Sequence, residues 1–355
     1  MSPWSAWRTG SNSGLRTVGS AIRNGRKRAR PSSPPKLICK ETGVSGEESG
    51  GHRSVLLTEC LAGLKLQPGG HYVDVTVGLG GHAEAVLNAL GPQGRMTVLD
   101  QDPTSLTFSR ERLAGFGDRV RFVAGNFERF DERAELAVGS VDGILADLGV
   151  SSPQLDRAER GFSLMRSGPL DMRMNPTEGL TARQMLERAT EEEVEEWLRA
   201  AGEERFARKL ARRLVDVAPR LITTEDLASA VARWVPRRGK THPATRVFMA
   251  LRMAVNREGA CLSEFLKRAP AVLKYGGRLV VVTFHSGEDR AVKWFGRRAA
   301  AEGVLRIVTK KPLEPTEEEQ RLNPRSRSAK LRVFEKIGSS PGSDEGRSAE
   351  KDLSF

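Results

Sequence analysis

Asp74-Val75-Thr76-Val77-Gly78-Leu79-Gly80-Gly81-His82 is the stretch that decides the fold, and it comes directly after the apolar pair Tyr72-Val73. A short β-branched run ends in a carboxylate, passes through a glycine cluster and continues into Ala83-Glu84-Ala85-Val86-Leu87, which predicts a helix. Glycines in such a turn let the backbone approach a ligand closely, and the helix N-terminus offers free N–H groups. The stretch therefore predicts the opening unit of a nucleotide-binding α/β fold, although similar turns also serve packing alone.

Length and composition restrict the class of protein. The 355 residues suffice for two domains, or for one domain with a large insertion, and for a sizeable core. No apolar run approaches the ~20 residues of a membrane span, so we expect a soluble protein with no membrane partner. The three cysteines, Cys39, Cys60 and Cys261, are too scattered for a zinc site or a disulfide framework. Their spacing predicts no metal and a reducing compartment.

The positive charge is unevenly distributed along the chain. The formal net charge is +12, and residues 1–40 hold nine Lys and Arg without one acidic residue, which leaves 48 basic against 45 acidic residues in the remainder. Residues 178–204 are acidic, whereas residues 205–257 carry 13 basic residues against three acidic ones. This local excess predicts a face that binds a polyanion, with a merely solvated helix surface as the alternative.

The two ends of the chain differ in composition from the middle. Residues 1–51 are rich in Ser, Gly, Arg and Pro and predict a disordered, basic N-terminal extension, and residues 338–355 predict a second disordered tail. An Arg-rich, acid-poor extension is typical of an organellar transit peptide, but a nucleic-acid-binding arm or an upstream start codon explains it equally well. We therefore expect a cytoplasmic, bacterial location, or an organellar one if the extension is a transit peptide.

The middle of the chain alternates in the manner of α/β proteins. The expected strands are Tyr72–Val75, Met96–Leu99, Arg121–Val123, Gly143–Ala146, Arg278–Thr283 and Leu331–Phe334. Between the fourth and fifth runs, residues 156–258 predict consecutive helices, with Thr190 and Glu193 as a capping box and Thr224 as a further cap. We therefore expect a parallel sheet built by residues 52–155 and 259–337 and interrupted by a helical insertion.

Two side chains are expected to meet a nucleoside. Asp100 closes the second predicted strand about 20 residues after the glycine turn, where a carboxylate can accept both ribose hydroxyls. Helix capping is the alternative, but it suits Asp102 better because Pro103 follows. Phe127 follows the third strand, where a ring can stack on adenine or belong to the core.

The loop after the fourth strand carries the candidate catalytic group. It reads Asp147-Leu148-Gly149-Val150-Ser151-Ser152-Pro153-Gln154, a polar and proline-stiffened segment beside the expected cleft. An aromatic amine such as cytosine N4 is a poor nucleophile, because its lone pair is delocalised into the ring. An acceptor of its N–H hydrogen bonds, such as Asp147, could localise that pair for attack on a methyl group.

Taken together, these segments resemble the MraW-type ribosomal small-subunit RNA (cytosine-N4)-methyltransferases of bacteria and organelles. The resemblance extends from His52 to about Ile337 and rests on several long sequence motifs that occur in the same order as in the family. They are Val55-Leu56-Leu57, Gly80-Gly81-His82, Asp147 to Asp156, Glu159-Arg160-Gly161-Phe162-Ser163, Gly168-Pro169-Leu170-Asp171-Met172-Arg173-Met174, His242-Pro243-Ala244-Thr245-Arg246, Phe284-His285-Ser286 with Glu288-Asp289-Arg290, and Asn323-Pro324-Arg325-Ser326-Arg327-Ser328.

The resemblance implies a class I S-adenosylmethionine-dependent methyltransferase, a Rossmann-like sheet with an inserted helical domain. It implies methylation of N4 of a cytidine in the decoding region of small-subunit ribosomal RNA, free or in the assembled subunit. Carried over by position, the residues expected at the cofactor are Gly80, Gly81, His82, Asp100, Phe127, Asp147 and Gln154. Those expected on the RNA side are Arg208, Arg212, Arg246, His285 and Arg325.

Two positions depart from the family pattern. Val77 stands where an aromatic residue is usual, and Gly287 replaces a usual leucine, which predicts a more flexible turn.

Three alternative functions fit part of the sequence. A nicotinamide dehydrogenase fits the glycine spacing but leaves the loop after Asp147 unexplained. A non-catalytic ribosome-assembly factor on the same fold would not need an intact cofactor pocket. The third alternative is a methyltransferase that acts on DNA or on another RNA. The sequence also allows a homodimer.

Overall fold

A seven-stranded mixed sheet forms the centre of the computed structural model, which describes residues 54–237, 239 and 241–338. The strand order is β3-β2-β1-β4-β5-β7-β6. The strands are β1 (His71–Asp74), β2 (Arg95–Asp100), β3 (Val120–Ala124), β4 (Val141–Asp147), β5 (Leu273–Thr283), β6 (Leu305–Ile307) and β7 (Lys330–Lys336). All six predicted runs fall on strands. The strands β3, β2, β1, β4 and β5 run parallel to one another. Strand β7 pairs antiparallel with both β5 and β6, so the prediction of a parallel sheet is wrong at that edge.

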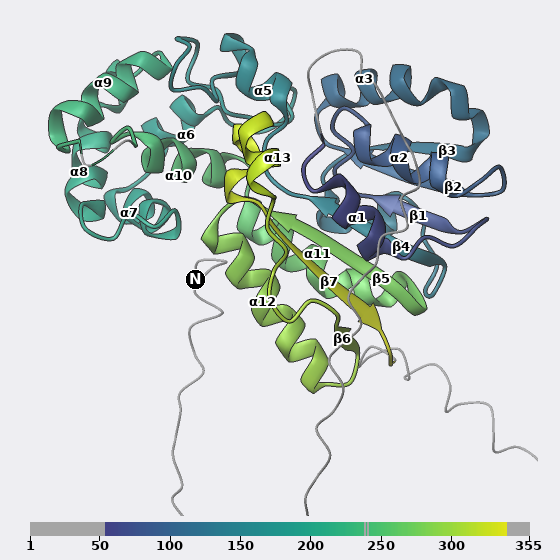
Figure 1. Cartoon of the computed structure of the whole chain (residues 1–355). Coiled ribbons are helices and arrows are strands. Elements are labelled where there is room, and N and C mark those ends of the chain that lie inside the picture. The colour runs from purple at the N-terminus through teal and green to yellow at the C-terminus, as the bar shows by residue number, and fades with distance from the viewer. Residues whose placement is uncertain (1–53, 238, 240, 339–355) are drawn as a thin grey trace, which may run out of the picture.

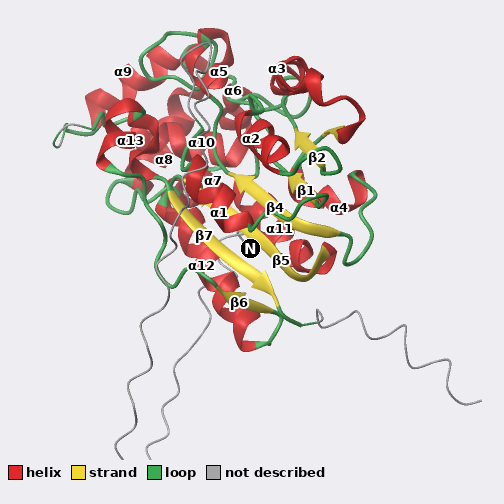
Figure 2. Ribbon diagram, turned by 45° about the vertical axis from the view of Figure 1, so that its right-hand side comes forward, coloured by secondary structure: helices red, strands yellow, loops and turns green. Residues whose placement is uncertain are grey.

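Helices cover both faces of the sheet (Figure 2). One face is covered by α1 (Leu57–Leu64), α2 (Gly81–Ala89) and α3 (Pro103–Leu113), the other by α4 (Phe130–Arg133), α11 (Glu258–Val272) and α12 (Ser286–Ala301). Alternate side chains of β5 enter the two layers, since Val280 packs with α1 and α2 while Val281 packs with α11 and α12. A strand buried on both faces needs a continuous apolar run, which explains the sequence of β5.

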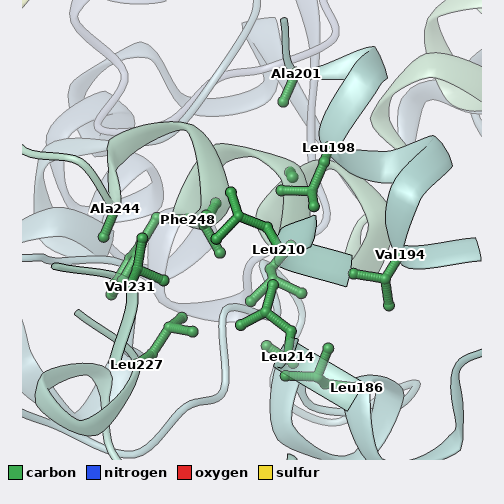
Figure 3. Packing of buried hydrophobic residues seen from close by; sticks show 14 of the residues in the cluster. Leu186, Val194, Leu198, Ala201, Leu210, Leu214, Leu227, Val231, Ala244 and Phe248 are labelled. Carbon is green, nitrogen blue, oxygen red and sulfur yellow. The ribbon is translucent and has the colours of Figure 1, made fainter. Parts of the chain in front are cut away.

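The helices between β4 and α11 have a hydrophobic core of their own (Figure 3). They are α5 (Ser152–Asp156), α6 (Ala182–Arg188), α7 (Glu191–Ala200), α8 (Ala207–Val217), α9 (Thr224–Trp234) and α10 (Thr245–Val255). Leu198 of α7, Leu210 of α8 and Phe248 of α10 meet in this core. We call residues 156–258 the helical block.

Two predicted helix starts can be compared with the structure. Thr190 and Glu193 form the expected capping box of α7. The prediction that Thr224 caps α9 is wrong, because Thr223 is the capping residue and makes a box with Asp226. The hydroxyl of Thr224 instead donates to the carbonyl of Arg166, 3.1 Å away.

A buried arginine attaches the helical block to the sheet. Arg160 donates to Oδ2 of Asp102 at 2.8 Å and to the carbonyl oxygens of Arg173 and Met174 at 3.0 and 2.9 Å. Asp102 caps α3 by accepting from the N–H of Thr104, as expected. One guanidinium therefore connects a helix of the sheet layer with the chain that enters the block.

The connection between β6 and β7 returns to the carboxyl ends of the parallel strands. This strap, residues 308–329, contains α13 (Glu317–Leu322) and the 3₁₀ helix η6 (Pro324–Ser328). Figure 1 shows α13 between the helical block and the sheet layer. Glu319 accepts a hydrogen bond from the N–H of Leu56 at 2.8 Å, and Arg325 pairs with Asp156 at 2.7 Å. In the part of the chain described here, no helix combines the length and apolar character that crossing a membrane requires.

Candidate active site

A pocket opens where β1, β2 and β4 end, the edge at which parallel sheets bind ligands. Its walls come from the sheet layer, the start of the helical block and the strap. Six of the seven residues expected at the cofactor line it, namely Gly81, His82, Asp100, Phe127, Asp147 and Gln154. The structure thus brings together residues that are up to 73 positions apart in the sequence.

The glycine turn forms a wall made of backbone. Gly78 and Gly80 have φ angles of 52° and 81°, which favour glycine, and the N–H of Gly80 donates to Val77 at 2.8 Å. A Cβ at Gly81 would lie 2.2 Å from Oγ of Ser54, so a side chain there would displace the Ser54 hydroxyl. Gly80 itself makes the turn behind the wall and is the one expected cofactor residue that does not line the pocket.

Asp100 supports the glycine turn and faces the pocket. Its Oδ2 accepts from the N–H of Gly78 at 2.9 Å, and its Oδ1 accepts from the N–H of Asp102 at 2.8 Å. Burial raises the pKa of Asp100 to about 6, against the lowering effect of these hydrogen bonds. Each carboxylate oxygen can accept a second bond, so the group can still receive two ribose hydroxyls.

Phe127 and Gln154 complete the expected set from opposite sides. Phe127 packs edge-on against Phe265, with ring centroids 5.6 Å apart, and also lines the pocket, so it serves core and pocket together. Gln154 is buried; its amide donates to Asp102 at 2.9 Å and its Oε1 accepts from the N–H of Ser151. It holds the loop after β4 in place.

Asp147, the last residue of β4, carries an unsatisfied carboxylate oxygen. Its N–H donates to the Thr76 hydroxyl at 2.7 Å, and its Oδ2 lies 3.6 Å from Nδ1 of His82. Within the described residues its Oδ1 is buried and has no hydrogen-bond partner. Burial, with the nearby charges of Asp74 and Glu288, raises the pKa of Asp147 well above its usual value. A buried acceptor without a donor marks a place where a ligand or an ordered water can donate a hydrogen bond.

The surroundings of the pocket are acidic. Asp74 is buried behind Asp147, and burial raises its pKa to about 7. Asp100, Asp147, Glu258 and Glu288 all line the pocket. A backbone cradle, a carboxylate placed for ribose and an excess of acidic groups fit a cationic ligand that contains a nucleoside.

One group of described residues could offer three metal ligands. Glu258, His285 and Glu288 place ligand atoms within 4.8 Å of one another. However, Arg252 takes both carboxylate oxygens of Glu258 at 2.8 Å, and His285 lies 3.3 Å from Glu288. Burial acts to raise the pKa of Glu288, but His285 and Arg252 outweigh it and hold the pKa below its usual value. Arg252 thus already pairs with Glu258, and His285 lies beside Glu288.

Several residues that sequence reasoning did not single out also line the pocket. They are Ser54, Met174, Asn256, Glu258, Cys261, Phe284, Glu288 and Asn323. Phe284 packs against Gly149, where an added Cβ would lie 3.3 Å from its ring. Phe284, Glu288 and Asn323 belong to motif words already noted in the sequence, but only the fold shows which member of each word faces the pocket.

The five residues expected on the RNA side do not gather in one place. Arg325 lines the pocket, whereas Arg208 and Arg212 are exposed one turn apart on α8. Arg246 lies in the first turn of α10 and pairs with Glu203 at 3.2 Å. The side chain of His285 is 10% exposed and caps α12 by accepting from the N–H groups of Gly287 and Glu288. Gly287 thus lies in a capped first turn of α12, where the sequence predicted a flexible turn.

Comparisons with known proteins show what the chain is similar to. The sequence profile described as the MraW methylase family matches residues 49–337. A protein of Cyanothece sp. named "Ribosomal RNA small subunit methyltransferase H" is 48% identical over 294 residues, which cover 82% of this chain and 96% of the relative. A protein of the same name from Gloeobacter violaceus is 49% identical over 298 residues, covering 84% and 91% of the two chains. A putative rRNA-methylase structure from Clostridium thermocellum is 12% identical with a TM-score of 0.41 and covers 81% of this chain and 99% of that chain.

Proposed function

The chain belongs to the MraW methylase family, whose members are S-adenosylmethionine-dependent methyltransferases, and we propose that it methylates N4 of a cytidine in the decoding region of small-subunit ribosomal RNA. The observation that carries the proposal is the buried Oδ1 of Asp147, which has no partner among the described residues and lines the pocket. An exocyclic amine is the kind of donor that such an oxygen requires. The names of the relatives support ribosomal RNA as the substrate.

Different pocket residues contact different parts of the methyl donor. The backbone of Gly78 and Gly81 leaves room for its methionine part, Asp100 accepts its ribose hydroxyls, and Phe127 borders its adenine side. When bound, the donor supplies an electrophilic methyl group on a positively charged sulfur. The acidic surroundings of Asp147 favour that charge, and the charge in turn lowers the pKa of Asp147 and keeps it ionised.

Asp147 then acts on the acceptor. Its free Oδ1 accepts an N–H of the cytidine amine, which localises the nitrogen lone pair for attack on the methyl carbon. The N–C bond forms as the S–C bond breaks, and the surplus amine proton leaves to Asp147 or to solvent. His82 lies beside the other carboxylate oxygen, since its Nδ1 is 3.6 Å from Oδ2 while its Nε2 bonds to the Val55 carbonyl at 3.0 Å.

We assign the helical block to RNA binding. Arg208 and Arg212 stand exposed on α8 within the basic stretch 205–257, and Arg325 extends positive charge to the rim of the pocket. Phosphate contacts by such residues position an RNA without reading its sequence. The target cytidine would have to leave its base stack to reach a buried carboxylate.

Mass spectrometry of ribosomal RNA tests the function directly. Small-subunit RNA from cells lacking the gene should lose N4-methylcytidine at one site, and the wild-type gene should restore it. Asp147→Ala should not restore it, whereas the matched variant Asp142→Ala, at the opposite end of β4, should. An unchanged nucleoside profile in the deletion strain would contradict the proposal, and S-adenosylmethionine binding would then separate an assembly factor from a methyltransferase with another substrate.

A further inference from the structure

Met165 presents an apolar side chain to solvent in the helical block. It is 91% exposed, in the segment that links the 3₁₀ helix η4 (Ala158–Arg160) to the rest of the helical block. Single exposed hydrophobic residues are common on protein surfaces, so exposure alone assigns no role. Met165 is the most exposed of the large hydrophobic residues in the described part of the chain, and the backbone on both sides of it is fixed.

The segment that carries Met165 is held by hydrogen bonds at several points. The N–H of Met165 donates to the Ser163 hydroxyl at 3.1 Å, and the Arg166 guanidinium donates to the carbonyl of Asp156. Thr224 bonds the carbonyl of Arg166 through its hydroxyl and the carbonyl of Gly168 through its N–H, at 3.1 and 2.9 Å. The loop is therefore ordered. Ordering its backbone costs conformational entropy, and the exposed side chain of Met165 makes no packing contacts with the described residues that would offset this cost.

Contacts of the neighbouring arginines place this loop at the mouth of the pocket. Arg325, which lines the pocket, donates to Oδ1 of Asp156 at 2.7 Å. Arg166, the residue after Met165, approaches the same oxygen to 4.0 Å from the other side. Two guanidinium groups from distant segments thus share one carboxylate, which leaves positive charge at the rim where an RNA backbone would enter.

A base that leaves its stack opens a gap, and side chains of nucleic-acid-binding proteins can fill such gaps. Methionine is among the apolar residues that insert between bases. Resting on the proposed function, we propose that Met165 is a wedge that enters the RNA stack in place of the target cytidine, while Arg166 and Arg325 hold the flanking phosphates. The wedge keeps the cytidine out of the stack long enough for its amine to meet Asp147.

The fluorescence of 2-aminopurine reports this unstacking without turnover. The probe is an RNA hairpin with the target cytidine and 2-aminopurine in the next 3′ position, bound to the full chain with S-adenosylhomocysteine. At saturation, measured by anisotropy, the wild type and Met165→Leu should raise the fluorescence. Met165→Ala should bind the hairpin and leave the fluorescence near its unbound level. Tyr275→Ala is the matched control, since Tyr275 is 81% exposed at the far end of β5 and should behave as wild type.

Methyl transfer to the same hairpin, without 2-aminopurine, provides the second measurement. Met165→Ala should lower kcat/KM by about tenfold or more, because unstacking then lacks its compensation. The loss should shrink when the neighbouring nucleotide is abasic, since no stack then has to open. Equal rates for Met165→Ala and wild type, an equal loss on both substrates, or wild-type binding without a fluorescence change would overturn the wedge. If the wild type neither binds nor methylates the hairpin, the proposed substrate fails, and the wedge with it.

Discussion

Nδ1 of His82 lies 3.6 Å from Oδ2 of Asp147, while the other ring nitrogen bonds to the carbonyl of Val55. Because a carbonyl only accepts, Nε2 carries a proton, and a neutral ring therefore turns its lone pair on Nδ1 toward the carboxyl group. Burial raises the pKa of Asp147, so its carboxyl group binds a proton more readily than an exposed aspartate does before the positively charged methyl donor is present. At 3.6 Å the two side chains interact electrostatically but are too far apart for a hydrogen bond.

Asp147→Asn should lower kcat by at least about 100-fold, in the range of losses seen when one transition-state hydrogen-bonding group is removed. RNA affinity should change little, because the group lies inside the pocket and contacts only the reacting base. Single-turnover methylation and filter binding of the same RNA measure the two effects. Asp142→Asn, on the same strand away from the pocket, is the control. Parallel losses of rate and RNA affinity would show that Asp147 is mainly structural.

The affinity for S-adenosylmethionine should fall as the pH drops below about 6. The ionised form of Asp100 accepts the ribose hydroxyls, and its pKa is about 6, so each further pH unit should weaken binding by up to about tenfold. Calorimetric titrations between pH 5 and pH 8 measure this dependence, and Asp100→Asn should flatten it. A 2′,3′-dideoxy analogue of the cofactor should lack the Asp100 contribution; an identical pH profile for that analogue would refute the assignment.

Asp74→Asn should stabilise the fold at high pH. The pKa of Asp74 is about 7 when folded and near 3.8 when unfolded, so the folded state binds the proton more tightly. Wild-type stability contributed by this group is greatest below pH 3.8 and decreases as the pH rises to about 7. At pH 8 the variant should gain a few kcal/mol in the free energy of unfolding, and near pH 4 it should gain little. Urea denaturation at both pH values checks the difference; an equal change at both would exclude ionisation as the cause.

Arg160→Leu should lower the free energy of unfolding by about 3–5 kcal/mol, because it leaves the carboxylate of Asp102 buried and unpaired. The double variant with Asp102→Asn should recover part of the loss. Arg199→Leu breaks an exposed pair with Glu195 and should cost far less than Arg160→Leu. A loss for Arg160→Leu no larger than for Arg199→Leu would show that the junction contributes little.

Charge reversal of Arg208 and Arg212 should weaken RNA binding and reduce its salt dependence. If each contacts one phosphate, the slope of log K against log salt should fall by roughly 2. Binding isotherms measured at salt concentrations between roughly 50 and 300 mM give this slope. Reversal of Lys293 and Arg297, exposed at the same spacing on α12, is the control. An unchanged slope would assign Arg208 and Arg212 to a solvated surface.

Local sequence was sufficient for six of the seven strands and for most of the expected pocket residues. The run Arg278–Thr283 predicted a strand, and the glycine turn predicted a close backbone approach, because both depend on short-range sequence. The strand β6 was missed, since three residues at an edge carry too little pattern. The antiparallel edge was also missed, because the return through the strap depends on tertiary packing rather than on the sequence of β7.

The part of the site that depends on contacts between segments distant in the sequence was harder to predict. Thr223 and Thr224 are adjacent and chemically alike, and only packing of the Met165 loop decides that the second serves Arg166. His285 lies in a motif word and was expected near RNA, but its ring turns inward to cap α12. The unpaired oxygen of Asp147 follows from where Thr76 and His82 lie, which the sequence does not contain.

The order of strands in the sheet has a consequence for synthesis of the protein. β4 pairs with β5, yet residues 148–272 separate them along the chain. At translation speeds of about 5–20 residues per second, this interval lasts roughly 6 to 25 s. During it β4 is an unpaired, apolar sheet edge on the ribosome, the kind of edge that recruits other chains. The helical block folds around its own core in that same interval, so the first half of the enzyme must wait as an open sheet until its closing strand emerges.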